Sequence, residues 1–193
     1  MYSKNKYQYT ARFCEENIWL LGKSLIAEDC SSADLTVLLL SNAGRQIPLF
    51  DQISCEKDFP ILWDYHVLLL KTPSSGDAKI FDFDSRLAFP TPLPDYFQQT
   101  FPDHEKLPAR FHIFIRTVPL DSYLQHFHSD RSHMLSNEGK PLSPFPPYPP
   151  ILVGKTTEKI LLWDYLDMTR ELNDGSSVYH CQSFFSEWLD LNF

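Results

Sequence analysis

The spacing of hydrophobic and polar residues changes several times along the chain, and each kind of spacing predicts a helix or a strand. Across residues 15–26 apolar positions recur at helical spacing, and Cys14 extends their stripe backward by four positions. Two carboxylates, Glu15 and Glu16, fall in the first turn, where they complement the helix dipole. The pattern predicts a helix that starts at or just after Cys14 and packs the face of that cysteine inward.

Strand patterns follow this helix. Residues 35–40 form an apolar run that ends in Ser-Asn-Ala-Gly, and residues 45–50 are expected to return as its hairpin partner. Residues 61–71 predict one continuous strand, which a Pro-Ser-Ser-Gly-Asp turn separates from the alternating segment 79–84. Residues 110–118 alternate in the same way. One helix followed by several strands on short turns predicts an α+β fold with a largely antiparallel sheet.

The last third of the chain has a different character. Residues 141–150 read PLSPFPPYPP, a sequence that favours a proline-stiffened loop over a helix or a central strand. Helical patterns follow near 157–166 and 183–191. The triplet Trp-Asp-Tyr at 163–165 repeats letters from 63–65, but it lies in a helical context and is interpreted as coincidence.

One histidine interrupts the apolar run 61–71. Because side chains alternate along a strand, Asp64 and His66 are expected to leave by one face, with Trp63, Tyr65 and Val67 on the other. A polar group in such a run costs free energy unless it is hydrogen-bonded. His66 is therefore either a core histidine bonded to a nearby carbonyl or a functional residue.

Composition narrows the class of protein. The chain has 193 residues, with 43% apolar and 15% aromatic residues, which fits a single domain over 1–193. Its net charge of −8 argues against binding nucleic acid or anionic lipid. The sequence contains neither an 18-residue apolar run nor an apolar signal segment near its start, so we expect a protein outside the membrane. Four scattered cysteines without paired spacing are typical of a reduced intracellular protein.

Nucleophilic chemistry by cysteine requires a thiolate, a base and a group that orients the base. A helix start favours the thiolate of Cys14, whereas Glu15 would oppose it, so a nearby imidazolium would be needed. His66 is the candidate. If strands 61–71 and 79–84 pair as a hairpin, His66 lies opposite or diagonal to Asp82 and Asp84, and the register does not separate the two.

A metal site is the competing interpretation. His126, His128 and His133 lie close together along the chain with Asp130, and an H-x-H pair can bind metal. No second cluster completes such a site, so it is disfavoured. Phosphate-binding glycine loops and zinc-protease motifs are absent from the sequence.

Several motifs occur here in one order: FCEENIW at 13–19, WDYHV at 63–67, FDFD at 81–84, DSYL at 121–124, SDRSHM at 129–134 and PPYP at 146–149. Together they resemble the protein N-terminal glutamine amidohydrolase family. The resemblance runs from about residue 9 to 150, and the helical part at 151–193 carries little of it.

The resemblance implies a cysteine hydrolase with a papain-like or transglutaminase-like core. Such an enzyme converts an N-terminal glutamine on a protein or peptide to glutamate and ammonia, in the N-degron pathway. The resemblance maps the catalytic triad onto Cys14, His66 and Asp82, with a thioester intermediate. It also implies no metal or cofactor, a monomer, and a cytoplasmic or nuclear location.

Recognition of a terminal residue needs a group that binds the free α-ammonium. Asp64, Glu15 and Glu16 are the candidates, although both glutamates are equally suited to simple dipole compensation. Two other functions stay open. A cysteine protease or transglutaminase would share the same triad, and a non-catalytic module could offer residues 141–150 to an SH3- or WW-type domain.

Overall fold

An antiparallel sheet forms the centre of the molecule. The computed structural model describes residues 2–56, 59–74, 77–155 and 157–190. Within these residues, six strands form the main sheet in the order β10-β7-β1-β4-β5-β6, and each neighbouring pair is antiparallel. Their bounds are β1 (Leu35–Ser41), β4 (His66–Lys71), β5 (Lys79–Phe81), β6 (Thr91–Pro92), β7 (Phe114–Pro119) and β10 (Ser177–His180). The predicted α+β class with a largely antiparallel sheet is confirmed.

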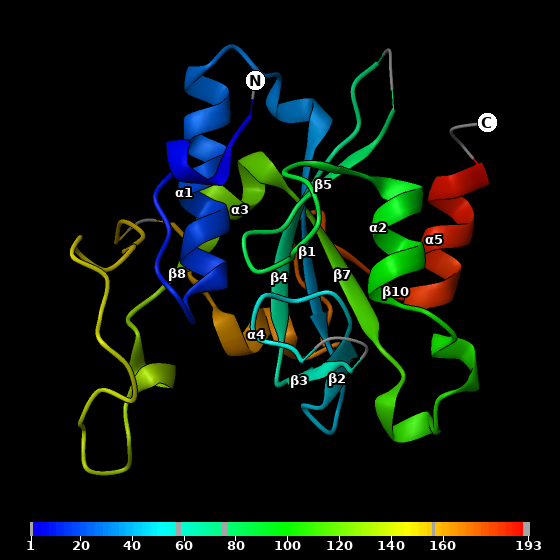
Figure 1. Ribbon diagram of the computed structural model, residues 1–193. Coiled ribbons are helices and arrows are strands. Elements are labelled where there is room, and N and C mark those ends of the chain that lie inside the picture. Colours follow the sequence, from blue (N-terminus) through cyan, green and yellow to red (C-terminus); the bar gives the residue numbers. More distant parts are fainter. Residues whose placement is uncertain (1, 57–58, 75–76, 156, 191–193) are drawn as a thin grey trace.

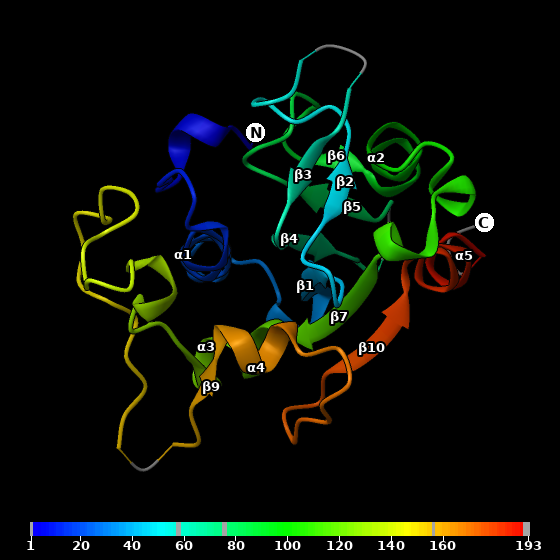
Figure 2. The same cartoon turned by 90° about the horizontal axis from the view of Figure 1, so that it is seen from below.

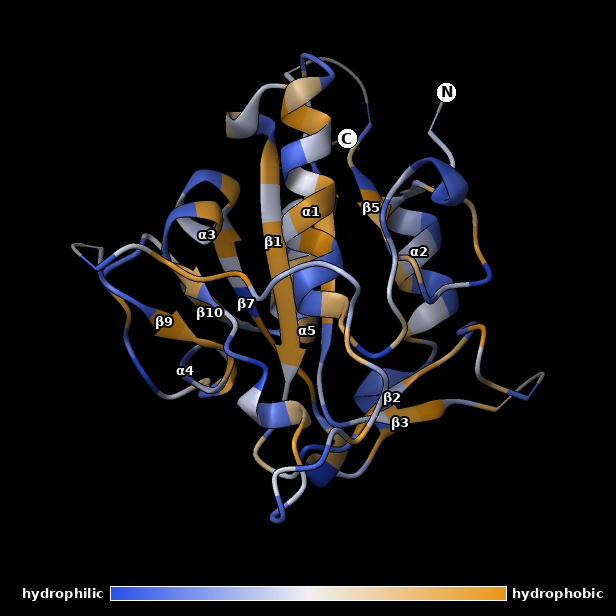
Figure 3. Cartoon of the chain, turned by 90° about the vertical axis from the view of Figure 1, so that its left-hand side faces the viewer, coloured by the Kyte–Doolittle hydropathy of each residue, from blue (hydrophilic) through white to orange (hydrophobic). Residues whose placement is uncertain are grey.

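Helices cover both faces of the sheet (Figures 1 and 2). One face packs against α1 (Cys14–Ala27) and α3 (Leu120–His126), and the other against α2 (Leu93–Thr100) and α5 (Cys181–Asp190). Successive residues of β1 therefore enter different cores: Val37 and Leu39 face α1, whereas Leu38 and Leu40 face α2 and α5. A strand buried on both faces is apolar along most of its length, as Figure 3 shows for β1.

The first helix begins and ends close to its predicted limits. Ile18, Leu21 and Leu25 are each at most 1% exposed and face the sheet. Burying one such side chain contributes about 2 kcal/mol, so this stripe fixes the helix on β1 and β4. Cys14 is the first helical residue, so the predicted position of its thiol at a helix start is confirmed.

One predicted strand pairing and one predicted strand are wrong. Residues 45–50 do not return to β1, because both edges of β1 are taken by β4 and β7. Instead β2 (Ile47–Leu49) pairs with β3 (Ile61–Trp63) in a separate two-stranded sheet. The predicted strand 61–71 is consequently two strands, since β3 belongs to this small sheet and β4 to the main one.

Other boundaries shift. The predicted strand 110–118 begins only at Phe114, after a short 3₁₀ helix at 109–111, and β5 covers only the first half of 79–84. Predicted helix 157–166 shortens to α4 (Leu162–Leu166), preceded by β9 (Ile160–Leu161), which pairs in parallel with β8 (Phe127–His128). The predicted helix 183–191 begins earlier, as α5, and its position 191 lies outside the described residues. Residues 141–150 form no helix or regular strand, as predicted.

A buried arginine attaches the C-terminal part to the sheet. Arg116 on β7 is 1% exposed, and its guanidinium donates to the carbonyl oxygens of Tyr165 (2.8 Å), Asp167 (2.7 Å) and Arg170 (2.8 Å). These bonds hold the end of α4 and the loop after it.

All four cysteines are free thiols, and in the described part of the chain no helix is both long and apolar enough to cross a bilayer.

Candidate active site

A cavity of about 290 Å³ opens where the start of α1 meets the junction between β3 and β4. Its walls combine a thiol, two carboxylates, an imidazole and several aromatic rings. The lining residues are Arg12, Cys14, Trp63, Asp64, Tyr65, Asp84, His133, Met134, Leu142 and Trp163.

The surroundings of Cys14 favour the protonated form of its thiol. Cys14 is 8% exposed, and its Sγ lies 3.7 Å from Oε2 of Glu15, to which it donates. Burial raises the pKa of this thiol well above its usual value, and the charges of Glu15, Asp84 and Asp64 raise it further. A hydrogen bond from the backbone N–H of Val67 opposes this effect only in part. A nucleophilic Cys14 would therefore need a base to accept its proton.

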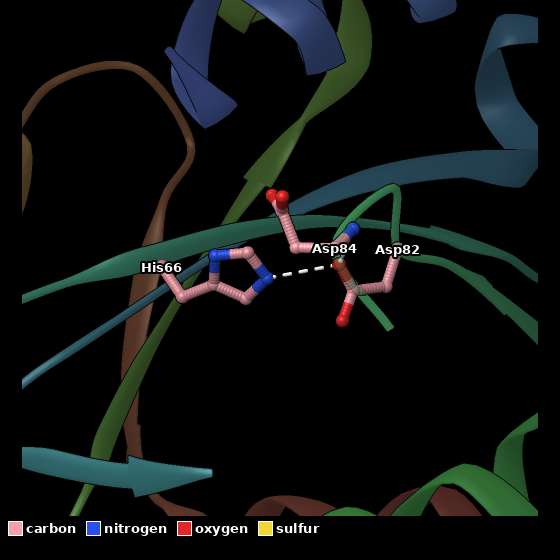
Figure 4. A group of neighbouring side chains, drawn as sticks. All are labelled: His66, Asp82 and Asp84. Carbon is pink, nitrogen blue, oxygen red and sulfur yellow. Dashed lines mark hydrogen bonds and ion pairs between the residues drawn. The ribbon is translucent and has the colours of Figure 1, made fainter. Parts of the chain in front are cut away.

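A buried imidazole–carboxylate pair lies next to Val67. Nε2 of His66 is 2.9 Å from Oδ1 of Asp82, and both side chains are at most 2% exposed (Figure 4). Gln52 (3.2 Å) and Tyr96 (2.8 Å) donate to the other oxygen of Asp82. Burial opposes ionisation of Asp82, but these partners, His66 first, lower its pKa to about 2. Burial would likewise lower the pKa of His66, yet Asp82 raises it above its ordinary value.

Hairpin geometry produces this pair, as the sequence predicts. The β4–β5 ladder ends where Leu69 pairs with Phe81, so Asp82 directly follows the last paired residue and lies diagonal to His66. Of the two candidate aspartates, Asp82 bonds the imidazole. Asp84 accepts the Tyr9 hydroxyl at 2.6 Å and lines the cavity instead.

The predicted side-chain faces of the motif at 63–67 are only partly correct. Trp63 stacks on the ring of His66, with centroids 5.1 Å apart and planes inclined by 17°. The break between β3 and β4 resets the alternation, so Trp63 is not on the side of Tyr65 and Val67. Nδ1 of His66 is buried, has no hydrogen-bond partner among the described residues, and faces away from Asp82 (Figure 4).

The two glutamates of the first turn have different neighbours, although both are completely buried. Glu16 is saturated: Arg131 donates to its two oxygens at 2.9 Å each, and Ser129 donates at 2.7 Å. Dipole compensation at a solvated helix start therefore does not describe Glu16, which attaches the segment after α3 to α1. It has no oxygen free for a substrate.

Glu15 faces the residues that line the cavity. Its Oε2 accepts the Tyr65 hydroxyl at 3.0 Å, and its Oε1 lies 3.1 Å from Nε2 of His133, at ion-pair distance but without hydrogen-bond alignment. The carboxylate thus lies behind Cys14, Tyr65 and His133 and is not part of the cavity wall.

Comparison with known proteins places this chain in a family. The model of the N-terminal glutamine amidase family matches residues 9–188. The chain is 35% identical to the protein N-terminal glutamine amidohydrolase of Bos taurus over 186 residues, covering 96% of this chain and 88% of the bovine protein. The Homo sapiens protein of the same name is 35% identical, covering 91% and 85%, and the Arabidopsis thaliana protein is 37% identical, covering 76% and 69%. The chain belongs to the N-terminal glutamine amidase family.

The family match extends past the motifs that first indicated it. Residues 9–188 include α4, β10 and most of α5, so the boundary at 150 marks the end of the recognised motifs and not the end of the family region. Sequence reasoning missed His133 and Trp163 as cavity residues of this amidase. His133 lies in one of the motifs, where the sequence suggests only a metal ligand, whereas nothing local distinguishes Trp163.

The competing metal interpretation can be compared with the candidate active site. In the described ranges, His66, Asp82 and Asp84 form a group whose potential ligand atoms lie within 4.8 Å of one another. Nε2 of His66 and Oδ1 of Asp82 already bond each other, so a metal ion would have to compete with this pair for those two atoms. The disfavoured histidine cluster is dispersed: His126 bonds the Glu158 carbonyl, while Nδ1 of His128 accepts from the backbone of Val153.

Proposed function

We propose that this chain hydrolyses the side-chain amide of an N-terminal glutamine in proteins or peptides, giving N-terminal glutamate and ammonia. The observation that carries the proposal is the buried His66–Asp82 pair, next in the chain to Val67, whose backbone bonds the Cys14 thiol, in a member of a family whose relatives are named for this activity. The product would present an N-terminal glutamate for arginylation in the N-degron pathway.

In the first half of the proposed reaction, Nδ1 of His66 accepts the thiol proton of Cys14. This is the ring nitrogen that has no hydrogen-bond partner in the part of the chain that the structure describes, and Asp82 stabilises the imidazolium that forms. The thiolate attacks the amide carbon of the substrate side chain, and its oxygen becomes an oxyanion. Backbone N–H groups at the start of α1 have no intrahelical acceptors and would stabilise that charge.

In the second half, the His66 imidazolium gives its proton to the leaving nitrogen, the C–N bond breaks, and ammonia departs. A thioester on Cys14 remains. His66 then takes a proton from water, the hydroxide attacks the thioester, and the C–S bond breaks to release the glutamate side chain. The thiol is restored with the same proton count at which it began.

Restriction to a terminal residue is assigned to carboxylates in the cavity wall. Asp64 and Asp84 line the cavity with Cys14, and both charges act on its thiol. A substrate whose amide carbon lies at Sγ would place its α-ammonium a few bonds away, within reach of these oxygens. Of the earlier candidates, Asp64 is therefore preferred over Glu15 and Glu16, and Asp84 joins it.

The order of nucleophile, base and acid along the chain, and the position of Cys14 at the start of a helix packed on an antiparallel sheet, support a papain-like or transglutaminase-like core. Enzymes with such cores also cleave peptide bonds or transfer amines. Specificity must therefore be measured directly.

The test uses three matched peptides: one with free N-terminal glutamine, one with the same residue N-acetylated, and one with an internal glutamine. Ammonia release and peptide mass are followed. The proposal expects release from the first peptide alone, with conversion to glutamate. Peptide-bond cleavage, incorporation of an added amine, or equal release from all three peptides would overturn it.

A further inference from the structure

A second cavity, of about 410 Å³, lies next to the candidate active site. Trp163, which is 37% exposed, lines both cavities and so forms the boundary between them. Beyond it the wall is mainly apolar, from Phe114, Leu166 and Met168, with one guanidinium from Arg45. The two cavities therefore meet at the side chain of Trp163.

Arg45 lies on a hydrogen-bonded turn, and its guanidinium stacks on Trp163 without an ion-pair partner among the described residues. Its guanidinium lies over the Trp163 ring, 4.2 Å from the centroid, and it forms no ion pair with the described residues. The turn that carries it is bonded at both ends: the Arg45 N–H donates to the Asn42 carbonyl at 3.1 Å, and the Asn42 side chain accepts from the Gln46 N–H at 3.0 Å. Arg45 itself is in the left-handed region, at φ 49°, which a non-glycine residue adopts at a cost.

The acidic group of the same cavity is already bound. Oδ1 of Asp167 accepts both the N–H (3.0 Å) and the hydroxyl (2.6 Å) of Thr169 in its own loop. Arg45 is thus the charged group of this cavity that has no ion-pair partner among the described residues. The active cavity, by contrast, presents the carboxylates of Asp64 and Asp84.

A terminal glutamine is the first residue of a longer chain, and that chain must leave the active cavity. An extended peptide advances about 3.3–3.6 Å per residue, so the residues after glutamine need a path of their own. We propose that the second cavity binds the two or three substrate residues that follow the terminal glutamine, and that Arg45 selects an acidic side chain among them. This inference rests on the proposed function and names the substrate class it favours.

Charge complementarity identifies the occupant. Carboxylates at the active cavity suit an α-ammonium, and a guanidinium one cavity further along suits a carboxylate a few residues later. The apolar wall at Phe114 and Met168 would contact the aliphatic parts of the same segment. The preferred substrates are therefore chains that begin with glutamine and carry aspartate or glutamate at positions two to four.

The experiment compares ammonia release from Gln-Gly with release from six pentapeptides that begin with glutamine, carrying one Glu or one Lys at position two, three or four in a glycine background. Wild type is measured with Arg45→Glu and with Lys23→Glu. Lys23 is a matched control, because its ammonium lies 4.6 Å from the ring centroid of Trp19 on α1 and lines neither cavity.

We expect wild type and the Lys23 variant to show a KM about three- to five-fold lower for the best Glu peptide than for its Lys counterpart. Arg45→Glu should reverse that order of KM values, whereas Lys23→Glu should keep the kcat of wild type and its activity on Gln-Gly. Equal preference in wild type and Arg45→Glu would overturn the inference while leaving the proposed function intact. Absence of ammonia from Gln-Gly and every pentapeptide with wild type would instead refute the proposed function.

Discussion

Replacing Asp82 by Asn keeps the shape of the side chain and removes the buried charge that faces His66. Burial opposes this charge, but bonds from His66 and its neighbours hold the pKa of Asp82 at about 2, against an ordinary value of 3.8. Since one pKa unit corresponds to about 1.4 kcal/mol, ionised Asp82 adds about 2 kcal/mol to the free energy of unfolding. Because its folded pKa is lowered, this stability is present above about pH 4 and is lost as the pH falls through about 2.

The same substitution reverses the contribution of His66. In wild type, Asp82 raises the pKa of His66 above 6.5, so the charged imidazole adds stability below pH 6.5 and loses it as the pH rises through the folded value. Without Asp82, burial lowers that pKa, and the weaker effect of the Asp84 charge opposes this only in part. The variant therefore loses stability as the pH falls below 6.5, when the unfolded chain binds a proton that the folded one excludes.

The difference in unfolding free energy between wild type and Asp82→Asn should thus be largest near pH 5. It should shrink towards pH 8, and it should shrink by about 2 kcal/mol between pH 4 and pH 2. Urea titrations followed by tryptophan fluorescence at half-unit pH steps measure it, with Asp95→Asn, an exposed carboxylate on α2, as control. A difference that is constant from pH 8 to pH 2 would refute the ion pair.

Two further substitutions test the groups around the helix start. Glu15→Gln removes a charge that raises the pKa of the Cys14 thiol, so the pH midpoint of Cys14 alkylation by iodoacetamide should move down. An unchanged or higher midpoint would contradict this contact. Arg131→Ala leaves the completely buried Glu16 without its two charged hydrogen bonds and should lower the free energy of unfolding by about 3–5 kcal/mol in urea titrations at pH 7. A loss below about 1 kcal/mol would show that Glu16 has other compensation.

The sequence predicts the site where its geometry is local. A helix start follows from spacing and first-turn carboxylates, and a hairpin of two strands joined by a short turn brings His66 to Asp82. Both depend on contacts a few residues to about sixteen residues apart. The identity of the bonding aspartate depends on where the β4–β5 ladder ends, which spacing alone does not determine.

Contacts between distant segments were not predictable in this way. His133 and Trp163 reach the cavity from more than a hundred residues beyond Cys14, through loops whose course depends on tertiary packing. The break at 64–65 likewise arises because β2, which has no free edge of β1 to join, pairs with β3 instead. Strand content was predictable, but the choice of partner among several apolar strands was not.

The central claim, that Cys14 is the nucleophile, is tested most directly by ammonia release from a peptide with N-terminal glutamine. Cys14→Ala is compared with Cys55→Ala, since Cys55 is also a buried free thiol and does not line the cavity. The account predicts that Cys14→Ala loses activity by at least about a thousand-fold and that Cys55→Ala retains most of it. Wild-type rates from a folded Cys14→Ala protein would contradict it.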